Sequence, residues 1–279
     1  ADRAVTTAAH RLTISLKQHR GGAHPIEGRG LIASFDAQSD ALTVWSSTQL
    51  AHEARYFIMK LLGLDENRIR VVTPDVGGGF GAKFILYPEE VAISAASLLL
   101  NRPVKWIEDR REHFMASIQE RDQYWDVEVG FDDDGRLLGA RGTMISDAGA
   151  YTYQGINLHY NASTNFPGPY VLPHYKLNVS VVETNKTPTA PVRGAGYPEG
   201  CFAMERVIDA VARHRGLDRA EIRHRNLVPA SAIPYGTPMQ ARSTSAIVYE
   251  SGDFPACLDL ALKSADYKGF DARRDKARA

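Results

Sequence analysis

Residues 69–84 read IRVVTPDVGGGFGAKF, a short apolar run that leads into four glycines within five positions. The run predicts a buried strand, and Pro88 with the two glutamates after it predicts the start of a helix. Because glycine has no Cβ, the loop between them can adopt positive φ and admit a close approach to its main chain. Its N–H groups could then form a concave site for an anion or a polar cofactor. A tight structural turn is the alternative explanation for the same glycines.

The loop departs from two common phosphate-binding patterns. A P-loop needs Gly before its Lys and Ser or Thr after it, whereas Ala82 and Phe84 flank Lys83 here. The spacing of the glycines also differs from GxGxxG. Phe80 is unusual within such a cluster, since a large ring in a glycine loop generally packs against a neighbour or gates a site. A nucleotide-binding module is therefore the weakest of the hypotheses for this chain.

Apolar spacing on either side of the loop predicts strands in groups, with helices between them. The predicted helices span residues 51–62, 88–100, 198–215, 220–226 and 255–264, and the predicted strands span residues 11–19, 31–35, 42–46, 69–72, 104–108, 124–131, 137–145 and 175–182. Because regular β-α-β alternation is missing, this order favours an α+β fold of mixed or antiparallel sheets with packed helices. We expect a lead-in segment at 1–20, a first subdomain with the glycine loop at 21–145, a second subdomain at 146–265 and a charged tail at 266–279.

The composition argues against several classes of partner. The 279 residues carry 33 Lys+Arg and 33 Asp+Glu, so the formal net charge of +0 offers no general attraction to nucleic acid. The longest apolar run, 91–100, is too short to cross a bilayer, and the N-terminus has no apolar leader, so we expect a cytoplasmic chain without a membrane partner. The two cysteines, Cys201 and Cys257, form no CxxC pair that could hold an iron–sulfur cluster.

Two further segments could carry chemistry. Residues 187–199, TPTAPVRGAGYPE, place Arg193 beside a Gly-Ala-Gly backbone just before a predicted helix, where a planar guanidinium could bind an oxygen-rich ligand. Residues 45–49, WSSTQ, place Gln49 between a strand and a helix. Each has a simpler interpretation, because Arg193 could be a surface residue in a turn and Gln49 an ordinary residue of a helix's first turns.

The order and spacing of WSSTQ, VVTPDVGGGFGAK, RPVKWIEDRREHF and TNKTPTAPVRGAGYPE resemble the large subunits of the xanthine dehydrogenase/aldehyde oxidase family. The resemblance covers about residues 21–253 and falls in the N-terminal half of the molybdenum-cofactor region. It implies a molybdopterin-type cofactor, with the cytosine dinucleotide form as one option, and a molybdenum atom held through that cofactor rather than by protein ligands. The residues that it implies for cofactor binding are Gly78, Gly79, Phe80, Gly81, Arg193, Gly194, Ala195 and Gly196.

The resemblance also implies a reaction. Family members hydroxylate a carbon of a small organic substrate with water as the oxygen source, and pass electrons through 2Fe-2S clusters to FAD on partner subunits. Gln49 matches the glutamine that donates a hydrogen bond to the apical oxo ligand, and Arg193 would lie against the cofactor and shape the substrate pocket, so these two are the implied catalytic residues.

Three positions depart from particular branches of the family. Phe84 and Asn161 stand where the purine-oxidising members carry Glu and Arg, so we expect a pocket lined by Phe80, Phe84 and Asn161 that accepts an aldehyde or an N-heterocycle. Gly194 stands where the copper–molybdenum carbon monoxide dehydrogenases carry Cys, so we expect no copper.

The family's general base lies in a GVGE-type motif that this sequence lacks, and we do not assign its role to Glu199 or Glu205. We therefore expect one part of a multi-subunit enzyme that needs the C-terminal molybdenum-subunit half, a 2Fe-2S subunit and an FAD subunit, and that is inactive as an isolated chain. The alternative hypothesis is a non-catalytic, cofactor-free scaffold or fragment of such a subunit.

Overall fold

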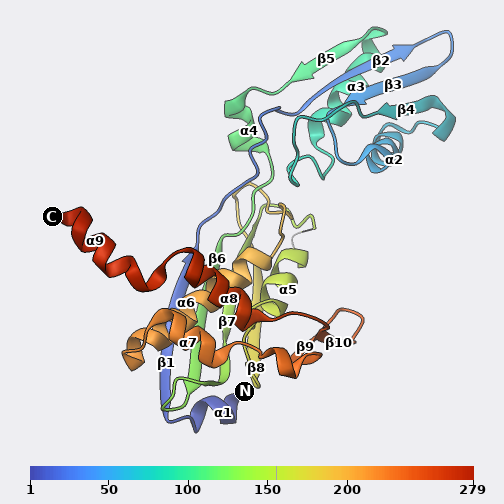
Figure 1. Ribbon diagram of the computed structural model, residues 1–279. Helices are drawn as coiled ribbons and strands as arrows, with labels where there is room; N and C mark the ends of the chain where they lie inside the picture. Colours follow the sequence, from blue (N-terminus) through green and yellow to red (C-terminus); the bar gives the residue numbers. More distant parts are fainter. Residues whose placement is uncertain (155) are drawn as a thin grey trace.

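The computed structural model describes residues 1–154 and 156–279. Figure 1 shows two lobes joined by a narrow neck, through which the chain passes more than once. Each lobe is built on a four-stranded mixed sheet. The predicted α+β class, with packed helices and two subdomains, is therefore confirmed.

The smaller lobe contains the glycine loop. Its sheet has the order β4-β3-β2-β5, in which only the β3–β4 pair is parallel. Two helices pack on the sheet, and α2 ends at Gly63, whose φ of 65° gives a left-handed C-cap. The bounds are β2 Gly30–Asp36, β3 Ala41–Ser46, α2 Ala51–Leu62, β4 Ile69–Val72, α3 Pro88–Leu100 and β5 Val104–Ile107.

The larger lobe has the sheet order β1-β6-β7-β8, with β7 and β8 parallel and the other pairs antiparallel. Alternate residues of β6, among them Trp125, Val127 and Val129, are buried because they face the long helix α6. Helix α5 packs against both α6 and β8. The bounds are β1 His10–Gln18, β6 Gln123–Phe131, β7 Leu137–Gly149, α5 Ile156–Thr164, β8 Tyr175–Glu183 and α6 Tyr197–Arg215.

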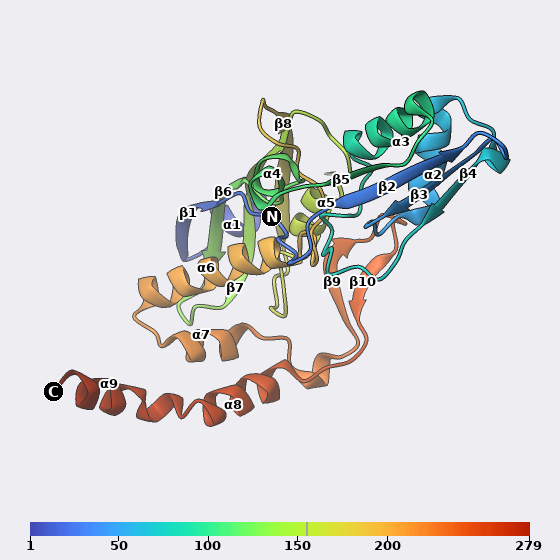
Figure 2. The ribbon, with the colours of Figure 1, turned by 90° about the horizontal axis from the view of Figure 1, so that it is seen from above.

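The remaining elements lie around this frame. Figure 2 shows α7 outside α6, and α8 with α9 farther out along the same side, ending at the C-terminus. No helix in the described part of the chain is long and apolar enough to cross a membrane. The bounds are α1 Asp2–Thr6, α4 Arg110–Ala116, α7 Arg219–Asn226, β9 Tyr235–Gln240, β10 Ala246–Tyr249, α8 Phe254–Ser264 and α9 Phe270–Arg278, with 3₁₀ turns at Glu66–Arg68, Ala230–Ala232 and Tyr267–Gly269.

The strands are distributed differently from the predicted division at residue 145. The predicted lead-in, 1–20, contains α1 and the edge strand β1, and β1 pairs with β6 along its whole length. The β6–β7 hairpin belongs to the same sheet as β8, so the predicted division at residue 145 falls within β7. The charged tail, 266–279, is mostly helical. The physical reason is that sheet membership depends on pairing between segments far apart in sequence, which local periodicity does not encode.

Candidate cofactor site

The glycine loop connects β4 to α3 on the side of the smaller lobe that faces the neck. Gly78 and Gly81 have φ of 97° and 103°, and Phe80 has φ of 54°, a region that side chains rarely adopt. Within the described residues, the N–H groups of Gly78, Gly79 and Phe80 donate to no protein acceptor. The loop therefore presents three successive main-chain donors.

Gln49 lies directly against this loop. Its main-chain N–H donates to Lys83 O (2.9 Å), and its side-chain Oε1 accepts from the N–H of Gly81 (3.0 Å). A Cβ built on Gly79 would come within 2.4 Å of the same Oε1, so glycine is required there for the carboxamide to pack. Since Oε1 is fixed by an N–H donor, the other end of the exposed carboxamide, Nε2, is a free donor with no acceptor among the described residues.

The Arg193 segment meets the glycine loop from the larger lobe. The N–H of Arg193 donates to Phe80 O (2.9 Å), and a Cβ on Gly81 would come within 2.3 Å of Pro191 O. Gly194 and Gly196 have φ of 98° and 92°, which turns the chain into α6. The exposed Arg193 guanidinium has no hydrogen bond or ion pair to any described residue. The two loops predicted to share a ligand are therefore in direct contact.

The predicted substrate-pocket residues are not brought into one cavity. Asn161, on α5, donates through Nδ2 to Ala195 O (2.9 Å) and lines an open groove of about 600 Å³ between α5, the Arg193 segment and the β9–β10 hairpin. Phe80 and Phe84 are 45% and 37% exposed and do not contribute to that groove in the described structure. The Arg193 segment contributes Pro191, Ala195 and Tyr197 to the same groove.

Glu199 and Glu205, to which the sequence assigns no catalytic role, lie in different surroundings. The Glu199 side chain is fully buried at the start of α6, and burial raises its pKa, with Arg121 Nε 3.8 Å away as its nearest counterion. Glu205 accepts from Tyr170 Oη (2.6 Å) and from the Arg223 guanidinium. Glu205 is therefore held in a structural ion pair, whereas both side-chain oxygens of Glu199 are buried without a hydrogen-bond partner among the described residues.

Sequence reasoning missed one part of the site. Glu27, in the neck segment between β1 and β2, contacts the glycine loop and accepts a hydrogen bond from Lys83 Nζ (2.6 Å). Burial by itself raises the pKa of Glu27, but the hydrogen bonds from Lys83, Ser47 and Gly77 outweigh burial and leave that pKa below its usual value. The segment GGAHPIEGRG has no periodicity, so nothing local in it indicates this contact.

The free groups at this junction suit an acceptor-rich ligand. They comprise main-chain N–H donors, one carboxamide N–H₂ and one guanidinium, and the neighbouring carboxylate of Glu27 is paired with Lys83. A pterin with a phosphate and a metal–oxo group is a ligand of this kind. The residues present therefore fit the cofactor that the sequence implies.

Residues 1–227 match the molybdopterin cofactor-binding domain family. The chain belongs to this family. The match confirms the predicted family and covers both loops of the candidate site.

Similar proteins are large subunits of molybdenum enzymes. The nicotine 6-hydroxylase large subunit of Paenarthrobacter nicotinovorans is 34% identical over 99% of this chain and 34% of its own length. The carbon monoxide dehydrogenase large chain of Hydrogenophaga pseudoflava is 33% identical over 100% of this chain and 35% of its own. Among solved structures, quinoline 2-oxidoreductase from Pseudomonas putida 86 superposes with a TM-score of 0.88 at 31% identity, covering 99% of this chain and 35% of that one. The chain thus spans about a third of the length of these relatives.

Proposed function

We propose that this domain binds a molybdopterin-type cofactor at the contact between the glycine loop and the Arg193 segment, as part of a multi-subunit hydroxylase. One observation carries the proposal. The Arg193 N–H to Phe80 O bond brings together two loops whose remaining donors, the N–H groups of Gly78 and Gly79 and the guanidinium, have no described acceptor.

Different residues of the two loops would bind different parts of the cofactor. The N–H groups of Gly78, Gly79 and Phe80 would bind the dithiolene end of the cofactor, while Gly194, Ala195 and Gly196 would border it from the larger lobe. Gln49 Nε2, oriented by the Gly81 N–H, would donate a hydrogen bond to an oxygen ligand of the metal. Arg193 would add positive charge at the rim. When bound, the cofactor supplies a metal centre that activates water and accepts two electrons.

The proposed substrate is an aldehyde or an N-heterocycle. Phe84 and Asn161 leave the predicted pocket residues uncharged, and two of the similar proteins are named for N-heterocycles, nicotine and quinoline. One similar protein is named for carbon monoxide. Gly194 lacks the thiol that copper would need, so we favour a copper-free site.

The chain would act within an assembly. We propose as partners a C-terminal half that carries the catalytic Glu, a 2Fe-2S subunit and an FAD subunit, all in the cytoplasm. Support comes from the chain's share of its relatives' length and from a similar protein named as subunit gamma of a 6-hydroxypseudooxynicotine dehydrogenase complex. The cytosine dinucleotide form of the cofactor is part of the same proposal.

Elemental analysis of the complex purified from its native host tests this function. We expect about one molybdenum per complex, because one cofactor performs the chemistry. A well-folded complex without molybdenum would instead support the cofactor-free scaffold. Binding of a nucleoside triphosphate with magnesium would support a nucleotide-binding module.

A further inference from the structure

A polar cluster at the base of the glycine loop has no role in the proposed function as described so far. A single carboxylate oxygen, Glu27 Oε2, accepts three hydrogen bonds: from Gly77 N (2.7 Å), Lys83 Nζ (2.6 Å) and Ser47 Oγ (2.8 Å). Lys83 Nζ also donates to Ser47 Oγ (2.7 Å). We call these four residues the Glu27 clasp.

The clasp joins the segments that form the candidate site. Gly77 and Lys83 stand at the two ends of the glycine loop, so one oxygen atom closes the loop at its base. Ser47 follows β3 and lies two residues before Gln49, whose own N–H donates to Lys83 O (2.9 Å). The clasp therefore fixes the loop and the carboxamide relative to each other.

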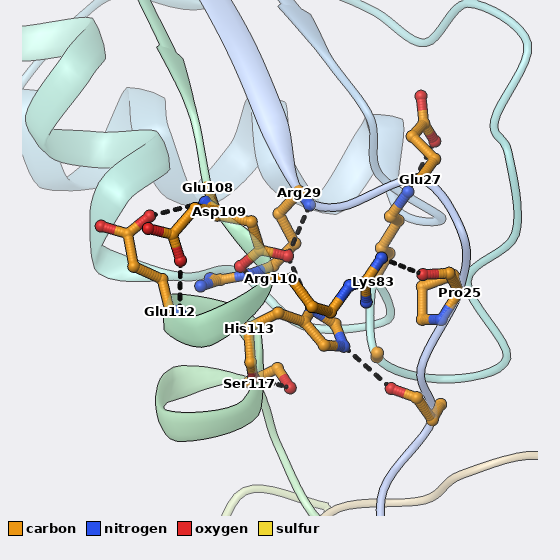
Figure 3. A network of polar contacts seen from close by, with 12 residues as sticks. Pro25, Glu27, Arg29, Lys83, Glu108, Asp109, Arg110, Glu112, His113 and Ser117 are labelled. Atoms are coloured by element: carbon orange, nitrogen blue, oxygen red, sulfur yellow. Dashed lines mark hydrogen bonds and ion pairs between the residues drawn. The ribbon is translucent and has the colours of Figure 1, made fainter.

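The neck segment that carries Glu27 is itself held firmly (Figure 3). His113 Nε2 donates to Ala23 O (2.9 Å), and Arg110 Nη2 donates to the carbonyls of Pro25 and Ile26 (both 2.7 Å). These donors come from α4, which belongs to the same neck. The main chain that carries Glu27 is therefore fixed by hydrogen bonds from α4.

Charge makes the clasp a strong constraint. The Lys83 side chain is 1% exposed, whereas that of Glu27 is 42% exposed. A buried ammonium is tolerated only with a counterion, and among the described residues Lys83 has no carboxylate partner other than Glu27. Loss of the Glu27 charge alone would therefore destabilise the fold more than loss of both charges.

We propose that Glu27 and Lys83 are positioning residues that hold the glycine loop in its cofactor-accepting shape before the cofactor arrives. A loop that is already ordered loses less conformational entropy when it binds the cofactor. The inference rests on the proposed function for its purpose. The ordering of the loop can nevertheless be measured without the cofactor.

The test is amide hydrogen exchange on the whole complex, produced in a host that cannot make the cofactor. The reporters are the N–H groups of Gly81, Ala82 and Phe84, which have acceptors but do not touch Glu27. The variants are Glu27→Gln, the charge-balanced pair Glu27→Gln/Lys83→Met, and the control Glu205→Gln, which breaks a partly buried ion pair with Arg223 far from the loop.

We expect reporter exchange to rise about tenfold or more in both Glu27 variants and to stay unchanged in the control. The melting temperature should fall in Glu27→Gln and recover in the charge-balanced pair. The reporter amides of that pair should still exchange faster than in the wild type. A merely structural ion pair would instead let loop exchange recover together with melting temperature.

Exchange equal to wild type in the charge-balanced pair would overturn the proposal. A wild-type complex that carries no molybdenum when made in a cofactor-competent host would overturn the proposed function. The two failures are distinguishable, because the exchange experiment never uses the cofactor.

Discussion

The two loops of the candidate site are held in different ways. The glycine loop is fixed by side chains from outside it, through Glu27 and Gln49. The Arg193 segment is fixed by close main-chain packing, since a Cβ on Gly196 would come within 2.6 Å of Leu158 O on α5. The glycine loop therefore depends on charge and side-chain hydrogen bonds in addition to its close main-chain contact at Gly81, whereas the Arg193 segment depends on main-chain packing. Substitutions can test these two kinds of stabilisation separately.

The largest effect should come from Gly196→Ala. The new Cβ would meet the main chain of α5 at a residue with φ of 92°, so the α5–α6 contact must open. We expect a loss of about 3 kcal/mol in the free energy of unfolding, measured by denaturant titration. Gly216→Ala, at the other end of α6, is the matched control, because φ is 65° and nothing lies within 4 Å; it should cost only about 1 kcal/mol. Equal losses in the two variants would contradict packing as the cause.

Gly79→Val should prevent the cofactor from binding while it destabilises the fold only slightly. Its Cβ would meet only the flexible Gln49 carboxamide, so the fold should lose no more than about 1–2 kcal/mol. The displaced carboxamide and the branched side chain should together prevent cofactor loading, which elemental analysis of the complex would report. A full complement of molybdenum in this variant would remove the glycine loop from the site.

Gln49→Ala should affect turnover more than loading. It removes the proposed donor to the oxygen ligand of the metal, and we expect kcat to fall about a hundredfold. Molybdenum content should stay near the wild-type value, because the free N–H groups of Gly78, Gly79 and Phe80 persist. Unchanged kcat in a molybdenum-loaded variant would show that this carboxamide has no part in the reaction.

The smallest effect concerns pH. The pKa of Glu27 is lowered from 4.5 in the folded chain, so its contribution to stability is complete above 4.5 and is lost as pH falls through the lowered pKa. Hydrogen exchange at Gly81 should accelerate in that acid window in the wild type. The Glu27→Gln/Lys83→Met variant should lack this acceleration. An equal acceleration in the wild type and in the variant would assign it to another titratable group.

Local sequence patterns predicted much of the fold. The helices at Ala51–Leu62 and Pro88–Leu100 and the strand at Ile69–Val72 form where apolar spacing and end signals coincide. Helix α5 was not predicted, because its Asn, Ser and Thr residues favour caps and turns, and its packing is set by Gly196 and Gly200 of a distant helix. Helix α4 carried a readable signal, the capping box of Asp109 and Glu112, that went unused.

The candidate site shows the same limit. Gln49, Gly79 and Arg193 were found because they lie in short motifs, and the structure brings them together. The partnership of Glu27 with Lys83 could not be predicted, since 56 residues separate them and Glu27 lies in a segment without periodicity. Contacts of this kind arise where the neck segment meets the smaller lobe and are encoded only in the complete fold.

The position of the metal tests the central claim most directly. An anomalous difference map at the molybdenum edge, from crystals of the assembled complex, should show its peak beside Gln49 Nε2 and the N–H groups of Gly79 and Phe80. A peak remote from both the glycine loop and Arg193 would contradict the account.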